Sequence, residues 1–296
     1  MTRLLVTGKN GQVGWELHRS LQCLGEVHAV DRAQLDLERP ERITAYLDQL
    51  APDVIVNAAA YTAVDKAESE EGLATTVNGV APGVIAVWAA RHGRLLLHYS
   101  TDYVFDGSGS SPWKPSDAPA PLSVYGRTKL AGERAIAEAG GQYLVLRTSW
   151  VFASRGRNFL RTMLRLAQER EELRIVDDQW GAPTCARLIA DTTAQIVARS
   201  LVERREGSFR SEILHLTASG ATSWHGFAAA IIGDARAAGR GVKAKSLVAI
   251  PSSAYPTPAR RPGNSQLDCS GLVDRFGLQL PDWRTGLSLC LDELNS

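Results

Sequence analysis

Short aliphatic runs alternate with longer amphipathic stretches through the first half of the chain, and this alternation restricts the fold more than any other feature. The runs are RLLVTG, EVHAVD, DVIVNAAA, RLLLHYS and YLVLRT, and helix-like segments such as VGWELHRSLQCLG and PERITAYLDQL separate them. Strands that alternate with helices in this way are typical of a parallel sheet covered by helices on both faces. We therefore expect an α/β protein with a doubly wound parallel sheet.

In such a sheet, ligands bind beyond the carboxyl ends of the strands. The residues that follow the runs are therefore candidates for one shared site: Gly8 to Gly14, Asp31, Ala58 to Thr62, Ser100 to Asp102 and Thr148 to Trp150. These segments are distant in the sequence, and the expected fold would bring them to one edge of the sheet.

A glycine-rich turn, GKNGQVG, follows the first run and opens the first helix. Glycines let the backbone approach phosphates, and the free amides at a helix start bind negative charge. This G-x-x-G-x-x-G spacing is associated with short-chain dehydrogenases and predicts a Rossmann-like dinucleotide site. The residues expected there are Gly8, Gly11, Gln12, Val13 and Gly14. A tight strand-to-helix turn that binds no ligand is the structural alternative.

Asp31 and Arg32 stand at the end of the second run. A carboxylate at this position would accept hydrogen bonds from an adenosine ribose, whereas an arginine could pair with a 2′-phosphate. Because the two preferences oppose each other, we expect the protein to accept both NADH and NADPH. Asp36 and Leu37 would reach the adenine, and a helix-capping role for Asp36 is an equal alternative.

Tyr125 and Lys129 lie four residues apart in SVYGRTKLAGERAIAEAG, which is typical of a helix, so both side chains share one face. A nearby cation lowers the pKa of a tyrosine, which is about 10 in water. Thr101 ends the fourth run, and its hydroxyl could hold a substrate oxygen while Tyr125 moves a proton. The three predict a catalytic triad, although Thr101 alone could be a solvated strand end. His98, in the same apolar run, is interpreted as structural.

Composition favours a small-molecule partner. The 296 residues carry 33 basic and 32 acidic side chains without long runs of one sign, so no footprint for nucleic acid or an anionic membrane is present. Cys23, Cys185, Cys269 and Cys290 are widely spaced, as in reduced cytosolic proteins. Met1 runs directly into a strand, and no apolar run approaches the roughly 18 residues of a membrane helix. We expect a soluble, cytoplasmic protein.

Eight segments spread over the chain carry a family likeness: GKNGQVGWEL, VNAAAYTAVDKAESE, HYSTDYVFDG, VYGRTKLAGE, RTSWVF, NFLRTMLRLAQEREEL, DDQWGAPT and YPTPARRPGNS. Together they resemble the dTDP-4-dehydrorhamnose reductase family of extended short-chain dehydrogenases over nearly the whole chain. The glycine and tyrosine motifs belong to the superfamily, whereas RTSWVF, DDQWGAPT and YPTPARRP are specific to these reductases and their close relatives.

The resemblance implies a reaction and a set of cofactor contacts. NADPH or NADH would deliver hydride to C4 of dTDP-4-dehydro-β-L-rhamnose, the last step of dTDP-L-rhamnose synthesis for surface polysaccharide such as lipopolysaccharide O-antigen. Ala60, Tyr61 and Thr62 would contact the middle of the cofactor. Tyr125 and Lys129 would also contact the cofactor. Tyr125 would protonate the C4 alkoxide, and Lys129 would hold the nicotinamide ribose and lower the pKa of Tyr125.

The same resemblance places Thr101, Asp102 and Trp150 against the sugar. Trp150 could instead be an ordinary core aromatic just beyond a strand. Arg260 and Arg261, in the proline-rich segment, could clamp the nucleotide diphosphate or could be surface charges, and we expect one of them on phosphate.

Two domains are expected. Residues 1–155 would form an NAD(P)-binding Rossmann domain, and residues 156–296 would form mainly a smaller C-terminal lobe that binds the nucleotide sugar. Some elements of the second part would return to pack on the first. The alternation of strands and helices loosens after the boundary, and a proline-rich stretch covers residues 254–265.

Some members of the family bind Mg²⁺ through glutamates at a dimer interface. Glu16 and Glu293 occupy suitable positions here, but Arg187 stands where a further glutamate is expected, and its charge would oppose a metal. We therefore assign no metal ligands, treat Mg²⁺ as possible but disfavoured, and expect a monomer or a homodimer.

Three alternatives remain. Nucleotide-sugar dehydratases share the fold but need an acid pair after the threonine, and here Tyr103 follows Asp102. A reductase that makes the opposite C4 configuration, of the 6-deoxytalose type, is not excluded by residue types, because pocket shape decides which face of the sugar receives hydride. A non-catalytic NADP-binding regulatory subunit would have no reason to keep the triad.

Overall fold

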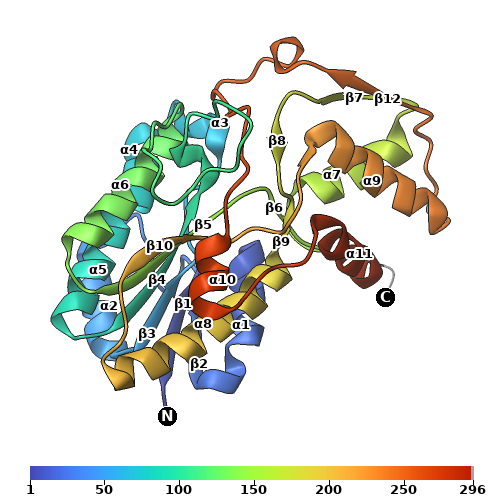
Figure 1. The fold of residues 1–296 in the computed structure, drawn as a ribbon. Coiled ribbons are helices and arrows are strands. Elements are labelled where there is room, and N and C mark those ends of the chain that lie inside the picture. The colour runs from blue at the N-terminus through green and yellow to red at the C-terminus, as the bar shows by residue number, and fades with distance from the viewer. Residues whose placement is uncertain (295–296) are drawn as a thin grey trace.

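The computed structural model describes residues 1–294, and a six-stranded parallel sheet forms its centre (Figure 1). The spatial order is β10-β5-β4-β3-β1-β2. The strands are β1 (Arg3–Thr7), β2 (Glu26–Val30), β3 (Val54–Asn57), β4 (Leu95–Thr101), β5 (Gln142–Thr148) and β10 (Glu212–His215). The strand order reverses between β1 and β3, which is the point where such sheets bind ligands. The predicted Rossmann-like sheet is confirmed.

Three longer helices cover one face of the sheet: α2 (Ile43–Leu50), α5 (Ala81–Arg91) and α6 (Val124–Glu138). Between β3 and α5 the chain forms the short helices α3 (Val64–Ala67) and α4 (Glu71–Thr75) and a π-helical segment, Thr76–Val80. Buried aliphatic side chains from the strands and helices, including Ile55, Ile85 and Ile136, form the core on this side.

The opposite face is covered by α1 (Gln12–Ser20), α8 (Ala186–Glu206) and α10 (Ser270–Phe276). Leu4 and Val6 of β1 pack there against Leu17 of α1 and Ile189 of α8. Alternate residues of each strand face the two cores, because successive side chains of a strand point to opposite faces. α8 ends at Gly207, whose φ of 73° gives the left-handed cap that glycine adopts without strain.

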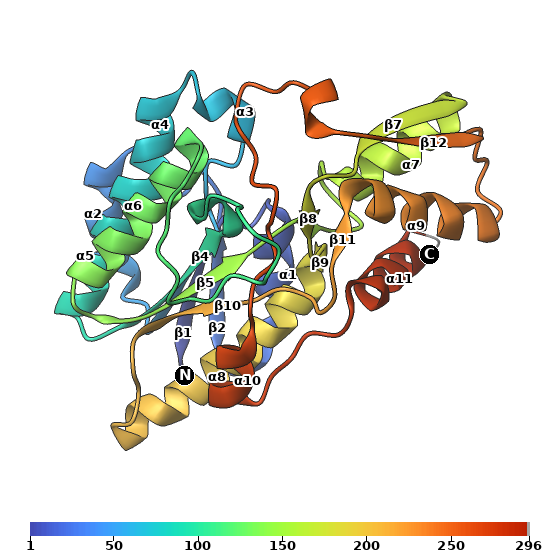
Figure 2. The same ribbon diagram turned by 45° about the horizontal axis from the view of Figure 1, so that its top comes forward.

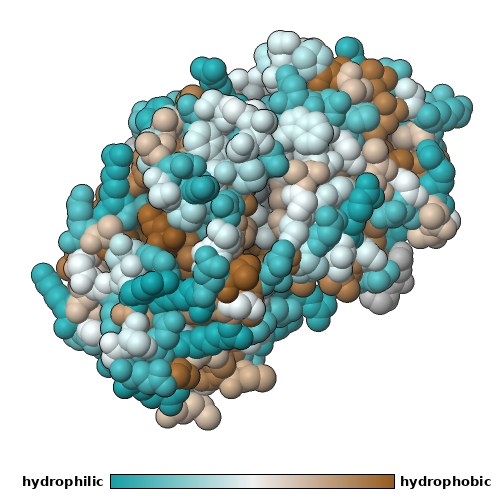
Figure 3. Space-filling model, in the orientation of Figure 1, coloured by the Kyte–Doolittle hydropathy of each residue, from teal (hydrophilic) through white to brown (hydrophobic). Residues whose placement is uncertain are grey.

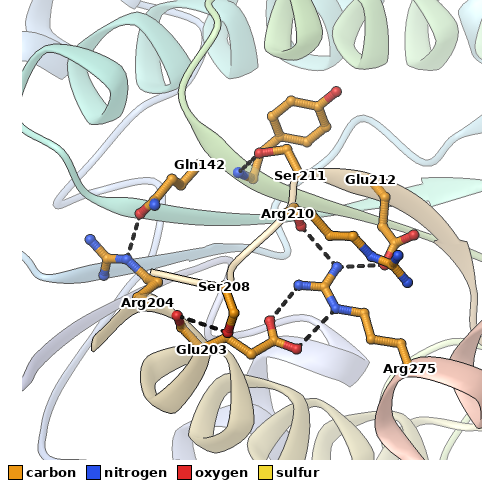
Figure 4. A network of polar contacts seen from close by, with 9 residues as sticks. Gln142, Glu203, Arg204, Ser208, Arg210, Ser211, Glu212 and Arg275 are labelled. Carbon is orange, nitrogen blue, oxygen red and sulfur yellow. Dashed lines mark hydrogen bonds and ion pairs between the residues drawn. The ribbon is translucent and has the colours of Figure 1, made fainter. Parts of the chain in front are cut away.

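Polar side chains join α8 and α10 to each other and to strands β5 and β10 of the sheet (Figure 4). Arg275 of α10 donates to Glu203 of α8 at 2.5 Å and to Glu212 of β10 at 2.5 Å. Arg204 donates to the side chain of Gln142 on β5 at 2.6 Å. The chain after residue 155 thus supplies one strand and two helices of the sheet layer, and the domain division at that residue stays a prediction.

A smaller lobe lies beside the sheet (Figure 2). Its elements are α7 (Phe159–Glu169), α9 (Trp224–Ala237), α11 (Trp283–Glu293) and the parallel pair β7 (Glu172–Val176) and β12 (Ser246–Ile250). Two short pairs lie between it and the sheet: β6 (Val151–Phe152) with β9 (Thr184–Cys185), and β8 (Trp180–Gly181) with β11 (Thr222–Ser223). Phe152, Phe227 and Leu287 are in the core of this lobe.

The segment 251–269 runs from β12 of the lobe back to α10, passing close to α3 (Figures 1 and 2). We call it the strap. Its first end is held by Asp178, which accepts from the backbone amide of Ser252 at 2.9 Å. Farther along, Arg261 forms an ion pair with Asp65 of α3 at 2.8 Å. The strap therefore connects the lobe to the sheet domain across the carboxyl edge.

One helical stretch resembles a membrane helix in length and composition. It spans 21 residues from Glu71 to Arg91, and an 18-residue window within it has a mean hydropathy of 1.4. Half of that window is buried in the protein, where Ile85, Trp88 and Ala89 belong to the core. This burial is typical of a core helix of a globular fold.

Figure 3 shows mostly hydrophilic side chains on the face in view, with apolar ones scattered among them.

Candidate active site

The segments predicted to share a site meet at the carboxyl edge of the sheet. Strand pairing places Thr7 of β1 opposite Asn57 of β3, and Asn57 opposite His98 of β4. Thr101, the last residue of β4, lies opposite Thr148, the last residue of β5. The glycine turn, the loop after β3 and the ends of β4 and β5 therefore lie side by side.

The glycine turn has the geometry of a phosphate cradle. Gly8 has a φ of 75°, and a Cβ on Gly14 would come within 2.1 Å of the Gly8 carbonyl oxygen, so both positions require glycine. Gly11 caps α1 without any side-chain hydrogen bond, and the first turn carries no acidic residue. Backbone amides of Gln12 and Val13 at this helix start can therefore bind an anion. These features fit the pyrophosphate of a dinucleotide.

Gln12 also connects this turn to the lobe. Its side-chain carbonyl accepts from the Asn158 amide at 2.8 Å, and Asn158 caps α7. A ligand at the turn would therefore bind beside the first residues of the lobe.

Asp31 follows β2 at the far side of the turn. Its carboxylate accepts from the Ala33 amide at 3.0 Å and lies 3.2 Å from the Lys9 ammonium. The hydrogen bond from Lys9 lowers the pKa of Asp31. The carboxylate is therefore ionised near neutrality, as an acceptor for ribose hydroxyls requires.

Arg32 is largely exposed and its guanidinium forms ion pairs with Asp36, at 3.5 Å, and with Glu38. Asp36 also accepts from the backbone amide of Glu38 at 3.0 Å, so this residue caps a local turn. The side chain of Leu37 is buried in the core under α2. Only the backbone of Leu37 could therefore contact the adenine, and this contact stays a prediction.

These opposed charges give a prediction about cofactor choice. Asp31 favours a free ribose and Arg32 favours a 2′-phosphate, and a charge-assisted hydrogen bond contributes about 1.5–3 kcal/mol. We expect kcat/KM for NADH and NADPH to differ by no more than about 100-fold. Steady-state titration of both cofactors measures the ratio. A several-thousand-fold preference for either one would contradict the balance.

The loop after β3 is held by Asn78, which sequence reasoning did not identify. The Asn78 side chain accepts from the Tyr61 amide at 2.8 Å and donates to the Tyr61 carbonyl at 3.1 Å. It lies in the π-helical segment, and such segments are frequent at functional sites. The hydrogen bond to Glu70 raises the pKa of Tyr61 to about 12. Ala60, Tyr61 and Thr62 thus lie at the edge next to the glycine turn.

The predicted hydroxyl and phenol lie side by side. The Thr101 hydroxyl is near enough to the Tyr125 phenol to affect its pKa. Ser123 caps α6 by accepting from the Gly126 amide at 3.2 Å, which places Tyr125 in the first turn of that helix. Burial raises the pKa of Tyr125 to about 12, and the Asp102 charge contributes to this increase. Tyr125 is therefore protonated at neutral pH and is able to donate a proton.

Lys129 does not act on Tyr125 as expected. Its ammonium is 2% exposed and donates to the Tyr99 carbonyl at 2.6 Å, with His98 Nε2 at 3.0 Å. Burial lowers the pKa of Lys129 to about 8. The expectation that Lys129 lowers the pKa of Tyr125 is wrong for this structure, because the side chain points to β4. His98, which was assigned no role, is its partner.

Asp102 lies between the triad and the strap. Thr101 donates to its carboxylate at 3.0 Å, and the Ser265 hydroxyl of the strap lies nearby. Burial raises the pKa of Asp102 to about 6, so this carboxyl changes its protonation state near neutral pH.

Trp150 has a strained backbone and a fixed ring. Its φ of 48° is left-handed, which is unusual for a residue with a side chain and is frequent at functional sites. The indole stacks on Trp224 with ring centroids 3.6 Å apart. A Cβ on Gly181 would lie 2.7 Å from the Trp150 ring, so Gly181 leaves the space that the ring fills. The partly exposed ring is thus held in one orientation beside the site.

The two strap arginines differ in their surroundings. Arg261 forms a bidentate pair with Asp65, at 2.8 and 3.1 Å. Arg260 is exposed, and its charge lowers the pKa of Asp106 after the hydrogen bonds from Ser108. A role on phosphate, which was expected for one of the two, is therefore more compatible with Arg260.

The residues present do not fit a Mg²⁺ site. Arg187 forms an ion pair with Glu293, and Ser154 donates to the same carboxylate at 2.7 Å. Burial, followed by repulsion from Glu293, raises the pKa of Glu16. Among residues 1–294 no group of three or more histidine, cysteine, aspartate or glutamate side chains is arranged to hold a metal. The Arg187 guanidinium already neutralises the Glu293 carboxylate, which a metal would need as a ligand.

We accordingly expect metal removal to have no effect. Because Arg187 supplies the positive charge beside Glu293, treatment with EDTA should leave both activity and elution volume unchanged. Size-exclusion chromatography with and without EDTA, followed by activity assays on the eluted protein, provides the measurement. A shift to a smaller species or a loss of activity that added Mg²⁺ reverses would contradict this expectation.

Comparison with known proteins places this site in context. The sequence matches the family described as RmlD substrate binding domain over residues 1–296. It is 56% identical to dTDP-4-dehydrorhamnose reductase of Burkholderia thailandensis, with 99% of both chains covered. It is 48% identical to the protein of that name from Escherichia coli K12, covering 98% of this chain and 97% of the other.

Two solved structures are similar over their full length. The crystal structure of dTDP-4-dehydrorhamnose reductase from Bacillus anthracis in complex with NADP has a TM-score of 0.87 at 31% identity, covering 99% of this chain and 100% of that one. The orthologue from Clostridium acetobutylicum has a TM-score of 0.89 at 33% identity, with 100% of both chains covered.

Proposed function

The chain belongs to the dTDP-4-dehydrorhamnose reductase family, and on this premise we propose that it catalyses the NAD(P)H-dependent reduction of dTDP-4-dehydro-β-L-rhamnose to dTDP-β-L-rhamnose. It is an oxidoreductase that uses NADPH or NADH. The observation that carries the proposal is the contact between the Thr101 hydroxyl and the protonated Tyr125 phenol at the carboxyl edge of the sheet.

Each residue of the site has a proposed part in the reaction. The bound cofactor supplies the hydride to C4 of the sugar. Thr101 holds the C4 oxygen, and Tyr125 donates its proton to that oxygen as negative charge develops. The backbone amides at Gly11, Gln12 and Val13 hold the pyrophosphate of the cofactor. Lys129 holds the nicotinamide ribose.

Substrate positioning is proposed to come from both parts of the molecule. Asp102 accepts a hydroxyl of the sugar, and the fixed indole of Trp150 limits the orientations that the ring can take. Arg260 of the strap binds the diphosphate of the nucleotide sugar. Support for these roles is their common location at the edge where the strap crosses.

The alternative reactions have less support. Dehydration needs a base after Asp102, and burial raises the pKa of Tyr103 at that position, so this phenol does not ionise at neutral pH. A purely regulatory protein would not need a protonated tyrosine in contact with a threonine hydroxyl. A reductase of the 6-deoxytalose type remains a chemical neighbour that the product itself distinguishes.

The proposal also covers the setting of the enzyme. We infer that it acts in the cytoplasm as a monomer or homodimer and that it binds neither nucleic acid nor a membrane. Its product would serve the synthesis of surface polysaccharide such as O-antigen.

Oxidation of NADPH in the presence of dTDP-4-dehydrorhamnose tests the proposed function. We expect absorbance of the reduced nicotinamide to fall with this keto sugar and to stay constant with dTDP-glucose, which has no C4 keto group. Binding of NADPH without any oxidation by keto sugars would favour the regulatory alternative.

A further inference from the structure

We propose that His98 is a positioning residue that holds the Lys129 ammonium at the nicotinamide side of the site. The proposal rests on the function proposed above, because it concerns how the same site binds its cofactor.

The contact between the two side chains is direct and fully enclosed. Lys129 Nζ lies 3.0 Å from His98 Nε2 and 2.6 Å from the Tyr99 carbonyl oxygen, so consecutive residues of β4 provide both acceptors. His98 is 0% exposed and Lys129 2%. An ammonium has three N–H donors, and β4 therefore binds two of them and leaves one for a ligand.

The protonation state of His98 follows from its surroundings. Burial, with the Lys129 charge as a second cause, holds the pKa of His98 well below its usual range, so the ring is neutral. A neutral ring that accepts from Lys129 at Nε2 carries its proton on Nδ1. The Asn57 amide nitrogen lies 3.0 Å from Nδ1, and two N–H groups cannot form a hydrogen bond with each other. The amide oxygen must then face Nδ1, an exchange of oxygen and nitrogen that leaves the shape of Asn57 unchanged.

The remaining contacts end inside the protein. The other end of the Asn57 amide lies 2.6 Å from the Thr7 hydroxyl, and that hydroxyl accepts from the Ala59 backbone amide at 3.1 Å. Thr7 is 2% exposed. A proton-conducting path would need an exit to water, so this row of contacts serves to fix Lys129 rather than to move protons.

The row also lies along the edge where the cofactor is proposed to bind. Thr7, Asn57 and His98 lie side by side on β1, β3 and β4, and Ala59 packs against Gly8 of the phosphate turn. The row of contacts thus extends from the phosphate turn to the lysine that would meet the nicotinamide ribose.

Loss of the acceptor should weaken cofactor binding. His98→Leu leaves a buried ammonium with one protein acceptor fewer, and a hydrogen bond to a charged group is worth about 10- to 100-fold in an equilibrium constant. We expect the Kd of NADPH to rise by about that factor in His98→Leu, while the KM of the keto sugar changes little. In His98→Gln the side-chain oxygen can accept from Lys129, and most of the NADPH affinity should return.

His215→Leu is the matched control. His215 is equally enclosed, at 1% exposure, but lies on β10, two strands from β4. Its replacement should leave the Kd of NADPH unchanged even if stability falls. Titration of NADPH by calorimetry measures the Kd without any turnover. If the wild-type protein bound NADPH but reduced no keto sugar, the proposed function would be wrong, and the role of His98 could still be tested.

Two results would overturn the proposal: wild-type NADPH affinity in His98→Leu, or no recovery of affinity in His98→Gln relative to His98→Leu. A direct measurement on the wild-type protein covers the case in which these variants do not fold. The ring nitrogen chemical shifts of His98 in NMR should report a neutral ring protonated on Nδ1. A ring protonated on Nε2 would show that it does not accept from Lys129.

Discussion

Tyr125→Phe is expected to lower kcat for the keto sugar by about 10²- to 10⁴-fold, because positioned proton transfer contributes an acceleration of that size. The phenol is protonated at neutral pH, since burial raises its pKa to about 12. It is therefore the proton donor in contact with Thr101, and phenylalanine removes only the hydroxyl. NADPH should still bind, because the phosphate turn and Lys129 are unchanged. Rapid-mixing measurement of NADPH oxidation gives kcat, and calorimetry gives the Kd of NADPH.

Tyr143→Phe is the matched control for that experiment. Tyr143 lies near the beginning of β5, at the opposite end of the sheet from Thr148, so removal of its hydroxyl should leave kcat unchanged. An undiminished kcat in Tyr125→Phe would show that another group protonates the sugar oxygen, and the assignment of the triad would be wrong.

Arg147→Met is expected to destabilise the protein by about 3–5 kcal/mol, because it leaves a buried carboxylate without its partner. Arg147 of β5 forms a bidentate pair with Glu133 of α6 at 2.9 and 2.6 Å. Both side chains are 2% exposed, so water cannot replace the lost contact. The melting temperature should fall on the order of 10 °C for a chain of this size.

Removal of both charges separates the ion pair from the volume of the side chains. In the double variant Arg147→Met with Glu133→Leu, neither charge of this pair remains, and most of the lost stability should return. Thermal unfolding followed by circular dichroism compares the three proteins. A double variant that is no more stable than Arg147→Met would mean that packing, rather than the unpaired carboxylate, accounts for the loss.

Local patterns predicted where strands and helices begin and end, and with them two parts of the site. The glycine spacing predicted a turn in which Gly14 has no room for a Cβ, and the end of β4 together with the α6 helix predicted that Thr101 and Tyr125 would meet. Both depend on strand and helix periodicity, which a sequence shows directly.

Contacts across strands were not predictable in the same way. The helical spacing placed Lys129 on the face of Tyr125, but its ammonium bonds to His98 and Tyr99 because β4 packs under α6. The bond depends on the packing of α6 against β4, and the register of β3 and β4 sets Asn57 beside His98. Register between strands distant in sequence is a tertiary property, and a histidine in an apolar strand carries no local sign of its partner.

The stretch from Glu71 to Arg91 is also interpreted through its tertiary contacts. It contains three helical segments, and its burial in the core is typical of a helix of a globular fold. By contrast, the positive charge of Arg187 argued against a metal site from the sequence alone, and in the structure Arg187 forms an ion pair with Glu293.

The configuration at C4 of the product is the most direct test of the central claim. The protein is incubated with dTDP-4-dehydro-β-L-rhamnose and NADPH, and the proton couplings of the purified nucleotide sugar are assigned by NMR. The account predicts dTDP-β-L-rhamnose as the product. The opposite configuration at C4, a 6-deoxytalose sugar, or recovery of the unreduced keto sugar beside bound NADPH, would contradict it.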